Sequence, residues 1–507
     1  MIFKNTLKKN IHFYKNFSYI LDEVAKKYPE NIYITDDYRS YTFEEFNILV
    51  NKCCNLFYEM KLKKKDVISI YLNNSIEFVI LYFASIRYGT IINPLPISIS
   101  TEDIIKKTQF VKTKILFTFT RIPHLKKNYF LIEKNNFLKL LNKKSDKFNY
   151  KQKKFTSDIA AYYYSSGTSA EPKIIVYSNQ SIVATQFTMV KSKFLKTFSN
   201  HLCFLPMAHT SALRYSIKYC VSSVSTVFIK KNYWNIRKDF WRIIKENKIN
   251  FFQSVPSILQ LILESRKVLQ KQTSKQFQFI GCGSSYLSHN LKLEFEKKFN
   301  IKVANLYGLS ELGATHFEKK KILSSEQNII GKPFKHVEAK IIKNKQELPP
   351  NNIGEIAIKT PGLFIGYLKN KKLSKKKFYK NFFLTGDLGF KNKKGDFFYT
   401  DRKKNIIIKG GVNIEPEEIN NILKKNKNVL DVATFGIFDK IFGEEIISVI
   451  VSKNKLISCE KLKEKCRDEL GVIKTPKDIV CIKELPKTSS GKVLVRKIKD
   501  LYINEYE

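Results

Sequence analysis

The chain has 507 residues, which is too long for one ordinary hydrophobic core, so we expect two or more domains. Apolar residues make up 43% and aromatic residues 13% of the chain, and this composition excludes a disordered protein. The 90 Lys and Arg residues exceed the 46 Asp and Glu residues, but the lysines lie in small groups along the whole sequence. Because specific nucleic-acid binders concentrate their charge, we expect no specific nucleic-acid partner and interpret the excess as compositional, while peripheral contact with an anionic membrane stays open.

The sequence favours a soluble cytoplasmic protein. Residues 1–10 carry lysines but no apolar core of signal-peptide length. The most apolar stretch, residues 78–86, is far shorter than the ~20 residues that a membrane span needs. The eight cysteines form no C-x-x-C pair, which disfavours a zinc site and fits buried thiols in a reducing compartment. The oligomeric state is not indicated.

The first ninety residues alternate between strand and helix patterns, which predicts an α/β architecture. Thr42 and Glu45 resemble a capping box, and Gly89 ends a long apolar run. The expected elements are, in order, a helix over 18–28, a hairpin over 31–35 and 38–42, a helix from Thr42 to Met60, a strand over 67–72 and a helix over 76–88.

The same alternation continues in the middle of the chain, with strands expected over 159–164, 251–254, 277–281 and 302–307, and an amphipathic helix over 291–299. From about residue 341 the strands shorten and turns become denser, which predicts a small β-rich subdomain over about 335–401. A compact α+β segment follows Asp401. We therefore expect a large N-terminal domain over 1–401 and a small C-terminal domain over 402–507, with the boundary near 402–404.

The first motif that carries chemistry is a polar loop, Ser165 to Lys173, which follows the strand expected over 159–164. Successive small residues leave backbone N–H groups uncovered, hydroxyl groups add donors, and a lysine closes the segment. These are the parts of a polyphosphate cradle, although the Walker spacing is absent. Taken alone, the loop is equally well explained as an ordinary Ser/Thr turn.

This loop resembles the phosphate loop of the adenylate-forming (AMP-binding) superfamily, and the chain is similar to acyl-CoA synthetases. The family pattern is close to [ST]-S-G-T-T-G-x-P-K-G. The matching residues are Ser165, Ser166, Gly167, Thr168, Pro172 and Lys173. Ala170 and Ile174 stand where the family has glycine, and the first change stiffens the loop because alanine avoids positive φ.

Further family signatures follow in the expected order: Gly283-Ser284-Ser285, Tyr307-Gly308-Leu309-Ser310-Glu311, Gly354-Glu355-Ile356, Gly366-Tyr367 and Thr385-Gly386-Asp387. The resemblance implies that the first of them flanks adenine and that Tyr307 stacks on it. It implies that the Ser310 hydroxyl contacts the α-phosphate and that Glu311, with Thr168, holds Mg²⁺. It also implies that Asp387 accepts hydrogen bonds from both ribose hydroxyls, a geometry that suits a carboxylate.

Two signatures belong to the small C-terminal domain. Residues 401–411 resemble the family's hinge motif, in which Arg402 would reach the ribose or phosphate region and Lys404 would be the hinge. Asn405 departs from the usual acidic residue there. Residues 485–492 resemble P-x-T-x-S-G-K, whose lysine, here Lys492, bridges the carboxylate and the α-phosphate during adenylation. The resemblance implies that this domain is mobile.

The acid pocket is less well defined. His209 lies in a segment that resembles the family's L-P-x-x-H, so it would form or gate the acyl site, or it is a packed core histidine. No Asp or Glu occurs in residues 201–238, which disfavours an α-amino acid and favours a fatty or aromatic acid.

We therefore expect an acid–thiol ligase that uses ATP, Mg²⁺ and CoA. Two alternatives stay open. One is an acyl-AMP ligase that loads the phosphopantetheine of an acyl carrier protein. The other is a catalytically degenerate nucleotide-binding relative, which the departures at Ala170, Ile174 and Asn405 would fit.

Overall fold

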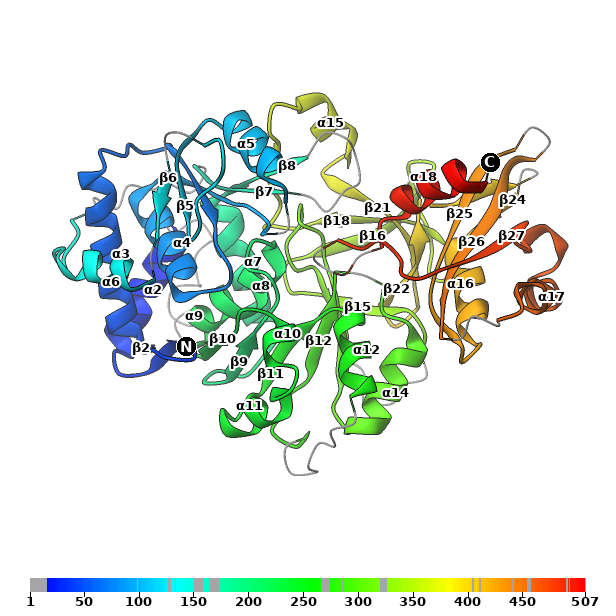
Figure 1. The fold of residues 1–507 in the computed structure, drawn as a ribbon, viewed down its shortest axis with the longest axis horizontal. Coiled ribbons are helices and arrows are strands. Elements are labelled where there is room, and N and C mark those ends of the chain that lie inside the picture. The colour runs from blue at the N-terminus through cyan, green and yellow to red at the C-terminus, as the bar shows by residue number, and fades with distance from the viewer. Residues whose placement is uncertain are drawn as a thin grey trace. The chain divides into compact units, whose positions relative to one another are not determined.

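The computed structural model describes residues 16–97, 99–125, 129–132, 134–149, 158–164, 173–265, 274–284, 286–319, 326–403, 405–409, 412–439, 442–453, 457–488, 491 and 493–506. Figure 1 shows the helices and strands in chain order, from blue at the N-terminus to red at the C-terminus. The chain divides into two compact units. The first unit comprises residues 1–324, 333–338 and 359–376, and the second comprises 325–332, 339–358 and 377–507. The predicted boundary at residues 402–404 stays a prediction.

A seven-stranded sheet in the first unit carries the predicted phosphate loop. Its spatial order is β19 (Gly366–Tyr367), β8 (Ile174–Ser178), β7 (Ile159–Tyr164), β4 (Ile91–Pro94), β3 (Val67–Tyr71), β5 (Thr113–Thr118) and β6 (Tyr129–Leu131). Strands β7, β4, β3, β5 and β6 are parallel, whereas β8 is antiparallel to both β7 and β19. The loop therefore connects the two strands of a hairpin.

A second set of strands in this unit is mostly parallel. Its order is β14 (His316–Phe317), β13 (Val303–Tyr307), β12 (Ile280–Gly283), β11 (Phe251–Ser254), β9 (Asn200–Cys203), β10 (Thr226–Ile229), β1 (Ile32–Thr35) and β2 (Ser40–Thr42). The hairpin over 31–42 is confirmed, because β1 and β2 pair antiparallel. The strand predicted over 277–281 is wrong in its bounds. Phe277 closes a turn by donating its N–H to Ser274 O at 3.3 Å, and strand β12 starts three residues later.

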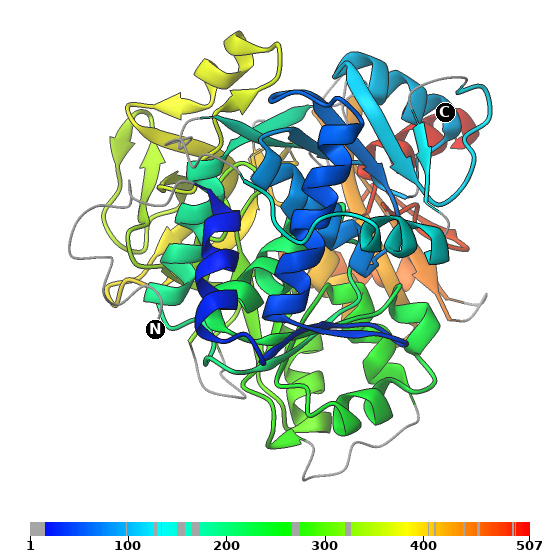
Figure 2. The same ribbon diagram turned by 90° about the vertical axis from the view of Figure 1, so that its left-hand side faces the viewer.

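Helices α2 (Phe17–Lys27), α3 (Phe43–Glu59) and α4 (Ile76–Tyr88) pack together, and α2 and α3 run side by side in Figure 2. The predicted capping box is confirmed: Thr42 Oγ1 accepts from Glu45 N–H at 3.2 Å, and Glu45 Oε2 accepts from Thr42 N–H at 2.8 Å. Helix α4 is apolar on all sides because it contacts both sheets. Tyr82 bonds Tyr163 of β7, and the Phe83 ring contacts Tyr33 of β1.

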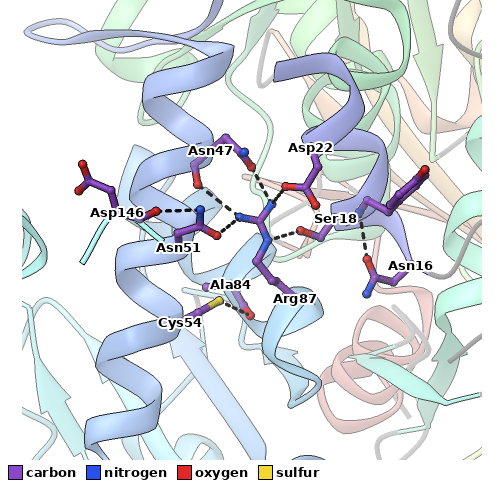
Figure 3. Close-up of polar contacts among 10 residues, drawn as sticks. Asn16, Ser18, Asp22, Asn47, Asn51, Cys54, Ala84, Arg87 and Asp146 are labelled. Carbon is purple, nitrogen blue, oxygen red and sulfur yellow. Dashed lines mark hydrogen bonds and ion pairs between the residues drawn. The ribbon is translucent and has the colours of Figure 1, made fainter. Parts of the chain in front are cut away.

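Arg87, at the end of α4, joins these three helices (Figure 3). Its guanidinium donates to Ser18 Oγ at 2.8 Å and Asp22 Oδ1 at 2.7 Å on α2, and to Asn47 Oδ1 at 2.7 Å and Asn51 Oδ1 at 2.6 Å on α3. The Arg87 side chain is fully buried in this network. A buried charge is tolerated where its donors are paired in this way.

The remaining helices of the first unit surround the two sets of strands. They are α5 (Thr101–Phe110), α6 (Lys134–Asn142), α7 (Asn179–Lys191), α8 (Thr210–Ala212), the π-helix η2 (Leu213–Lys218), α9 (Tyr219–Ser223), α10 (Tyr233–Ile236), α11 (Phe240–Glu246), α12 (Pro256–Glu264), α14 (His289–Phe299) and α15 (Lys371–Lys376). Helix α14 confirms the helix expected over 291–299 and begins two residues earlier. Its N-cap is Ser288, whose hydroxyl accepts from Leu291 N–H at 3.3 Å.

The β-rich part of the second unit is an antiparallel sheet. Its order is β17 (Gln346–Glu347), β16 (Glu338–Lys343), β18 (Gly354–Lys359), β21 (Phe382–Lys391), β22 (Phe397–Arg402) and β15 (Ile329–Pro333), with β20 (Phe378–Tyr379) also paired to β21. Apart from the ten-residue β21, these strands have two to six residues, in agreement with the β-rich subdomain that the sequence indicates in this region. The long pair β21–β22 places residues 387 and 402 opposite each other.

The C-terminal part is a small α+β domain. Its sheet has the order β24 (Val412–Ile414), β23 (Ile407–Lys409), β26 (Gly443–Ser452) and β25 (Val429–Asp439), with β27 (Asp478–Ile482) also paired to β26. Helices α16 (Pro416–Lys424) and α17 (Cys459–Leu470) share one apolar cluster with this sheet, and α18 (Val495–Tyr506) shares another. Val432 and Ala433, adjacent on β25, belong to different clusters, so the two helix groups cover opposite faces.

The predicted fold class is confirmed. The chain combines a large mixed α/β domain, a β-rich subdomain and a small α+β C-terminal domain. Among the described residues, no helix is long and apolar enough to cross a membrane.

Candidate nucleotide and acid site

The predicted phosphate loop spans the hairpin β7–β8. Ser165, Ser166, Gly167 and Thr168 lie outside the described residues, whereas Lys173 is half-buried immediately before β8. Ile174, one of the two departures from the family pattern, is the first residue of β8 and is 2% exposed, in a cluster with Tyr162 and Val176. Its side chain is part of this apolar core, which gives a structural reason for an apolar residue at this position.

The adenine-flanking signature and the tyrosine signature meet at the carboxyl ends of β12 and β13. These strands are parallel, and Gly283 is in register with Leu306. A Cβ on Gly283 would lie 2.5 Å from Leu306 O, and a Cβ on Gly308 would lie 2.2 Å from Gly313 O, so both turns require glycine. Ser284 has φ 68°, and Ser285 lies outside the described residues. Ligands of parallel sheets bind at this edge, as the resemblance implies here.

Tyr307, the expected adenine-stacking residue, is held from the neighbouring strand. It is in register with His316 of β14, and the two rings meet edge to face with centroids 5.6 Å apart. Burial lowers the pKa of His316 to about 3, so this imidazole is neutral and adds no charge to the site. Thr315 N–H donates to Tyr307 O at 3.1 Å, which fixes the backbone.

Glu311, the expected magnesium ligand, lies on the short turn after Tyr307. Its Oε1 accepts a hydrogen bond from the Tyr367 hydroxyl at 2.8 Å, and its backbone O accepts from Phe364 N–H at 2.8 Å. Tyr367 lies on β19 in register with Ile175, two residues after Lys173. The structure therefore brings Glu311 close to the start of β8, the strand that directly follows the predicted phosphate loop. Ser310 precedes it on the same turn and is half-buried.

The sequence analysis did not predict a role for Tyr367. It identified Gly366-Tyr367 only as one of the family signatures. Burial, followed by the charge of Glu311, raises the pKa of the Tyr367 hydroxyl well above its usual value. The hydroxyl therefore stays protonated and donates to the carboxylate. This hydrogen bond fixes the orientation of Glu311.

Asp387 and Arg402 come together in the second unit. They face each other on β21 and β22, and Arg402 Nε donates to Asp387 Oδ1 at 2.7 Å. The Asp387 carboxylate is 4% exposed, whereas Arg402 is partly exposed. Glu355 of β18 supports the same turn by accepting Gly386 N–H at 2.8 Å. Two residues predicted from separate motifs thus form one ion pair.

The predicted hinge segment, residues 401–411, is only partly described. Lys404 lies outside the described residues, as does Lys492. Asn405 N–H donates to Arg402 O at 2.8 Å, so the residue that replaces the family's acid closes a turn through its backbone. Burial raises the pKa of Asp401 to about 7, and nearby Glu417 adds to the rise.

His209 immediately precedes α8 and the π-helix η2. Burial lowers its pKa, which favours the neutral imidazole. The next residue, Thr210, lines a small pocket in the first unit together with Tyr163, Tyr177, Ile182, Thr185, Arg214 and Lys218. The sequence analysis missed Arg214 and Lys218. The available signal was two cations four residues apart in a segment without acids.

This pocket adjoins the Glu311 turn. Tyr177 lines the pocket, and the charges of Arg214 and Glu311 act on its hydroxyl in opposite directions, although burial is the main reason that its pKa rises to about 12. Thr185 also lines the pocket, and its Oγ1 lies only 2.7 Å from where a Cβ on Gly313 would be. The pocket therefore lies close to Glu311.

The sequence matches known families along most of its length. Residues 21–368 match the AMP-binding enzyme family, and residues 418–492 match the AMP-binding enzyme C-terminal domain. The chain belongs to the AMP-binding enzyme family. The resemblance inferred from the motifs is thereby confirmed.

Similar proteins in the AMP-binding family include several CoA ligases. The chain is 26% identical to oxalate–CoA ligase of Arabidopsis thaliana, over 96% of this chain and 98% of the relative. It is 24% identical to a crotonobetaine/carnitine–CoA ligase of Escherichia coli, over 90% of this chain and 93% of the relative.

Solved structures show the same fold. ATP-bound MatB from Rhodopseudomonas palustris superposes with a TM-score of 0.88 at 20% identity, covering 97% of this chain and all (100%) of that one. O-succinylbenzoate coenzyme A synthetase (MenE) from Bacillus subtilis, in complex with ATP and magnesium ion, gives 0.85 at 22% identity, covering 95% and 99%.

Proposed function

We propose that this protein activates a carboxylic acid with ATP, forming an acyl-adenylate and pyrophosphate, and then transfers the acyl group to the thiol of CoA. The observation that carries the proposal is the position of Glu311. Its carboxylate is fixed by Tyr367 beside the hairpin that bears the phosphate loop, on the turn that follows Tyr307. This arrangement, in a chain of the AMP-binding family, supports a binding site for a nucleoside triphosphate.

In the first step, a carboxylate oxygen attacks the α-phosphorus of ATP. A bond forms between that oxygen and phosphorus, and the bond from the α-phosphorus to the bridging oxygen of pyrophosphate breaks. Two anions must approach each other, so fixed positive charge and hydrogen-bond donors are needed. In this proposal Lys492 bridges the carboxylate and the α-phosphate, while Thr168, Ser310 and Lys173 bind phosphate oxygens.

The residues present fit Mg²⁺. Among the residues that the structure describes, no cluster of three His, Cys, Asp or Glu residues could hold a metal ion by itself. Mg²⁺ commonly needs only one or two carboxylates together with substrate phosphates and water. Glu311, oriented by Tyr367, supplies one carboxylate, and Thr168 would add a hydroxyl. When bound, the ion would neutralise charge on the phosphate oxygens.

In the second step, a thiol attacks the acyl carbon and AMP leaves with the oxygen that had joined them. In this proposal Asp387 holds the ribose hydroxyls, and Arg402 orients Asp387 through their 2.7 Å hydrogen bond. The domain over 402–507 would turn about Lys404 between the two steps, which withdraws Lys492 and admits the thiol. Such domain motions often limit turnover.

CoA is the favoured acceptor because the named relatives are CoA ligases of different acids, including oxalate and crotonobetaine or carnitine. To test this, purified protein, ATP and Mg²⁺ are incubated with a panel of acids, together with CoA or with a phosphopantetheinylated carrier protein. Pyrophosphate release measures the first step, and the thioester product identifies the acceptor. We expect a thioester with CoA. A thioester with the carrier alone would favour the acyl-AMP ligase.

The Lys492→Ala variant tests the catalytic assignment in the same assay. Removing one such electrostatic contact typically lowers the rate about 100- to 1000-fold. Lys483→Ala, an exposed lysine in the same domain, is the control and should keep the wild-type rate. If Lys492→Ala forms adenylate at the wild-type rate, Lys492 is not the bridging residue.

A further inference from the structure

Two cations are buried in the pocket beside the Glu311 turn. Arg214 and Lys218 are each 6% exposed, and both line the pocket. They lie on the π-helix Leu213–Lys218, whose hydrogen bonds run one residue wider than in an α-helix. Single π-helical turns are frequent at functional sites because they redirect side chains.

Neither cation has an acidic partner among the described residues. Lys218 Nζ meets the Tyr82 hydroxyl at 3.4 Å, and Tyr82 in turn bonds the Tyr163 hydroxyl at 2.8 Å. Arg214 lies against the Tyr215 ring, with its guanidinium carbon 5.8 Å from the centroid. Two buried like charges surrounded by neutral hydroxyls are costly, so the fold retains them at the expense of stability.

Lys292 is another buried lysine of the first unit, and it provides a comparison for Lys218. It is 4% exposed, on α14, and it pairs directly with the buried carboxylate of Glu318. Lys218 is equally buried, but burial, with the charge of Arg214 as a smaller cause, lowers its pKa to about 7. An anion bound beside Lys218 would raise this pKa again, because it stabilises the charged ammonium group. Among the described residues no carboxylate takes the place beside Lys218 that Glu318 takes beside Lys292, and this contrast favours a ligand as the source of the matching negative charge.

The pocket lined by Arg214 and Lys218 adjoins both the Glu311 turn and the His209 segment. Tyr177 and Thr185 connect it to the Glu311 turn, as described above, and Thr210 follows the His209 segment that the family resemblance associates with the acyl site. We propose that the acid is dicarboxylic: one carboxylate attacks ATP, and the other binds Arg214 and Lys218. This inference rests on the proposed function. A dicarboxylic substrate differs from the fatty or aromatic acid expected from the sequence. That expectation rested on the absence of Asp and Glu from residues 201–238 and did not consider Arg214 and Lys218.

The first test compares acids of equal chain length. Initial rates of pyrophosphate release are measured with wild-type protein for succinate against butyrate, glutarate against valerate and adipate against hexanoate, with benzoate as the aromatic case. Sites built to bind a polar group reject analogues that lack it, so we expect at least one diacid to exceed its monoacid at least about 100-fold in kcat/KM. A monoacid or benzoate that matches or exceeds the diacids would overturn the inference and leave the proposed function standing.

The second test uses variants. Lys218→Met and Arg214→Gln should raise KM for the diacid at least about 10-fold with KM for ATP unchanged, since each removes a charge-assisted contact. Lys218→Arg should restore much of the affinity. The control is Lys245→Met, an exposed lysine of α11, which should behave as wild type. If KM for ATP rises instead, the cations bind the nucleotide, and the inference is wrong.

The third test is the pH profile. In the part of the chain that the structure describes, the titratable and charged groups around Lys218 are Arg214 on its own helix, Tyr82 on α4, Tyr163 on β7 and Tyr177 on β8. Burial raises the pKa of all three hydroxyls, so they stay neutral near pH 7. KM for the diacid should therefore rise as pH increases through about 7 in wild type, and this rise should disappear in Lys218→Arg. Identical profiles would contradict a role for Lys218.

The outcomes separate the two levels of the proposal. If no acid in the panel releases pyrophosphate, the proposed function fails, and the inference fails with it. If monoacids alone are activated, only the inference fails. If Arg214→Gln does not fold, the wild-type substrate preference and the Lys218 variants still decide the question, because methionine in place of a buried unpaired lysine removes a desolvation cost.

Discussion

At the scale of single residues, the candidate site depends on contacts between motifs that are distant in the sequence. Glu311 could be predicted because it belongs to a short signature. Tyr367 lies 56 residues further on, and only the pairing of β19 with β8 brings its hydroxyl to the carboxylate. Arg214 and Lys218 were not singled out among ninety basic residues, since their spacing in a segment without acids is a weak signal and their burial becomes visible only in the structure.

Tyr367→Phe tests the Glu311 assignment. Without the hydroxyl, the carboxylate loses a fixed donor, and hydrogen bonds to charged groups contribute about 1.5–3 kcal/mol, so we expect kcat/KM for Mg·ATP to fall about 10- to 100-fold. The fold should be kept, because the aromatic ring remains. Tyr379→Phe is the matched control, since its hydroxyl donates to Lys345 O on the surface of the other unit. Equal activity of the two variants would show that Glu311 needs no support from Tyr367.

At the scale of elements, local signals predicted well and long-range ones did not. The capping box at Thr42 and the glycine after Tyr88 fixed the ends of α3 and α4, because such signals act within a few residues. The start of β12 was missed, since Phe277 closes a turn with Ser274 and the strand begins only three residues later, at Ile280. The π-helix Leu213–Lys218 was not expected, and the order of strands in each sheet could not be derived, because both depend on tertiary packing.

Arg87 provides the test at this scale. Arg87→Met would remove the guanidinium that donates to Asp22 and to the amide oxygens of Asn47 and Asn51, in contacts that join α2, α3 and α4. Breaking a buried charge pair costs about 3–5 kcal/mol, so the urea midpoint of unfolding should fall clearly. Arg242→Met, whose ion pairs with Asp239 and Glu246 are exposed, is the control and should change stability by less than about 1 kcal/mol. An unchanged midpoint for Arg87→Met would contradict the role of the network.

At the scale of the whole molecule, the fold class followed from alternating strand and helix patterns and from the change in texture after residue 341. The family followed from signatures in a fixed order. The formal net charge of +44 carried no such information, because its lysines are dispersed. Their field favours the approach of anionic substrates such as ATP without specifying any of them.

The dispersed charge makes a prediction about nucleic acids. Random-sequence duplex DNA should bind only at low ionic strength and should be released at physiological salt, because the attraction is purely electrostatic. An electrophoretic shift assay over a salt series measures this. A sequence-selective complex that persists at physiological salt would mean that the basic surface has a dedicated nucleic-acid partner.

In the proposed reaction a carboxylate oxygen of the acid attacks the α-phosphorus of ATP. Transfer of an oxygen isotope from the acid to AMP measures this attack directly. The acid preferred in the panel is labelled with heavy oxygen in its carboxylate and incubated with ATP, Mg²⁺, CoA and the protein, and the nucleotide and phosphate products are analysed by mass spectrometry. Because the attacking oxygen stays on phosphorus when the thiol takes the acyl group, AMP should gain one heavy oxygen while pyrophosphate gains none. Heavy oxygen in inorganic phosphate, with ADP as the nucleotide product, would contradict the account.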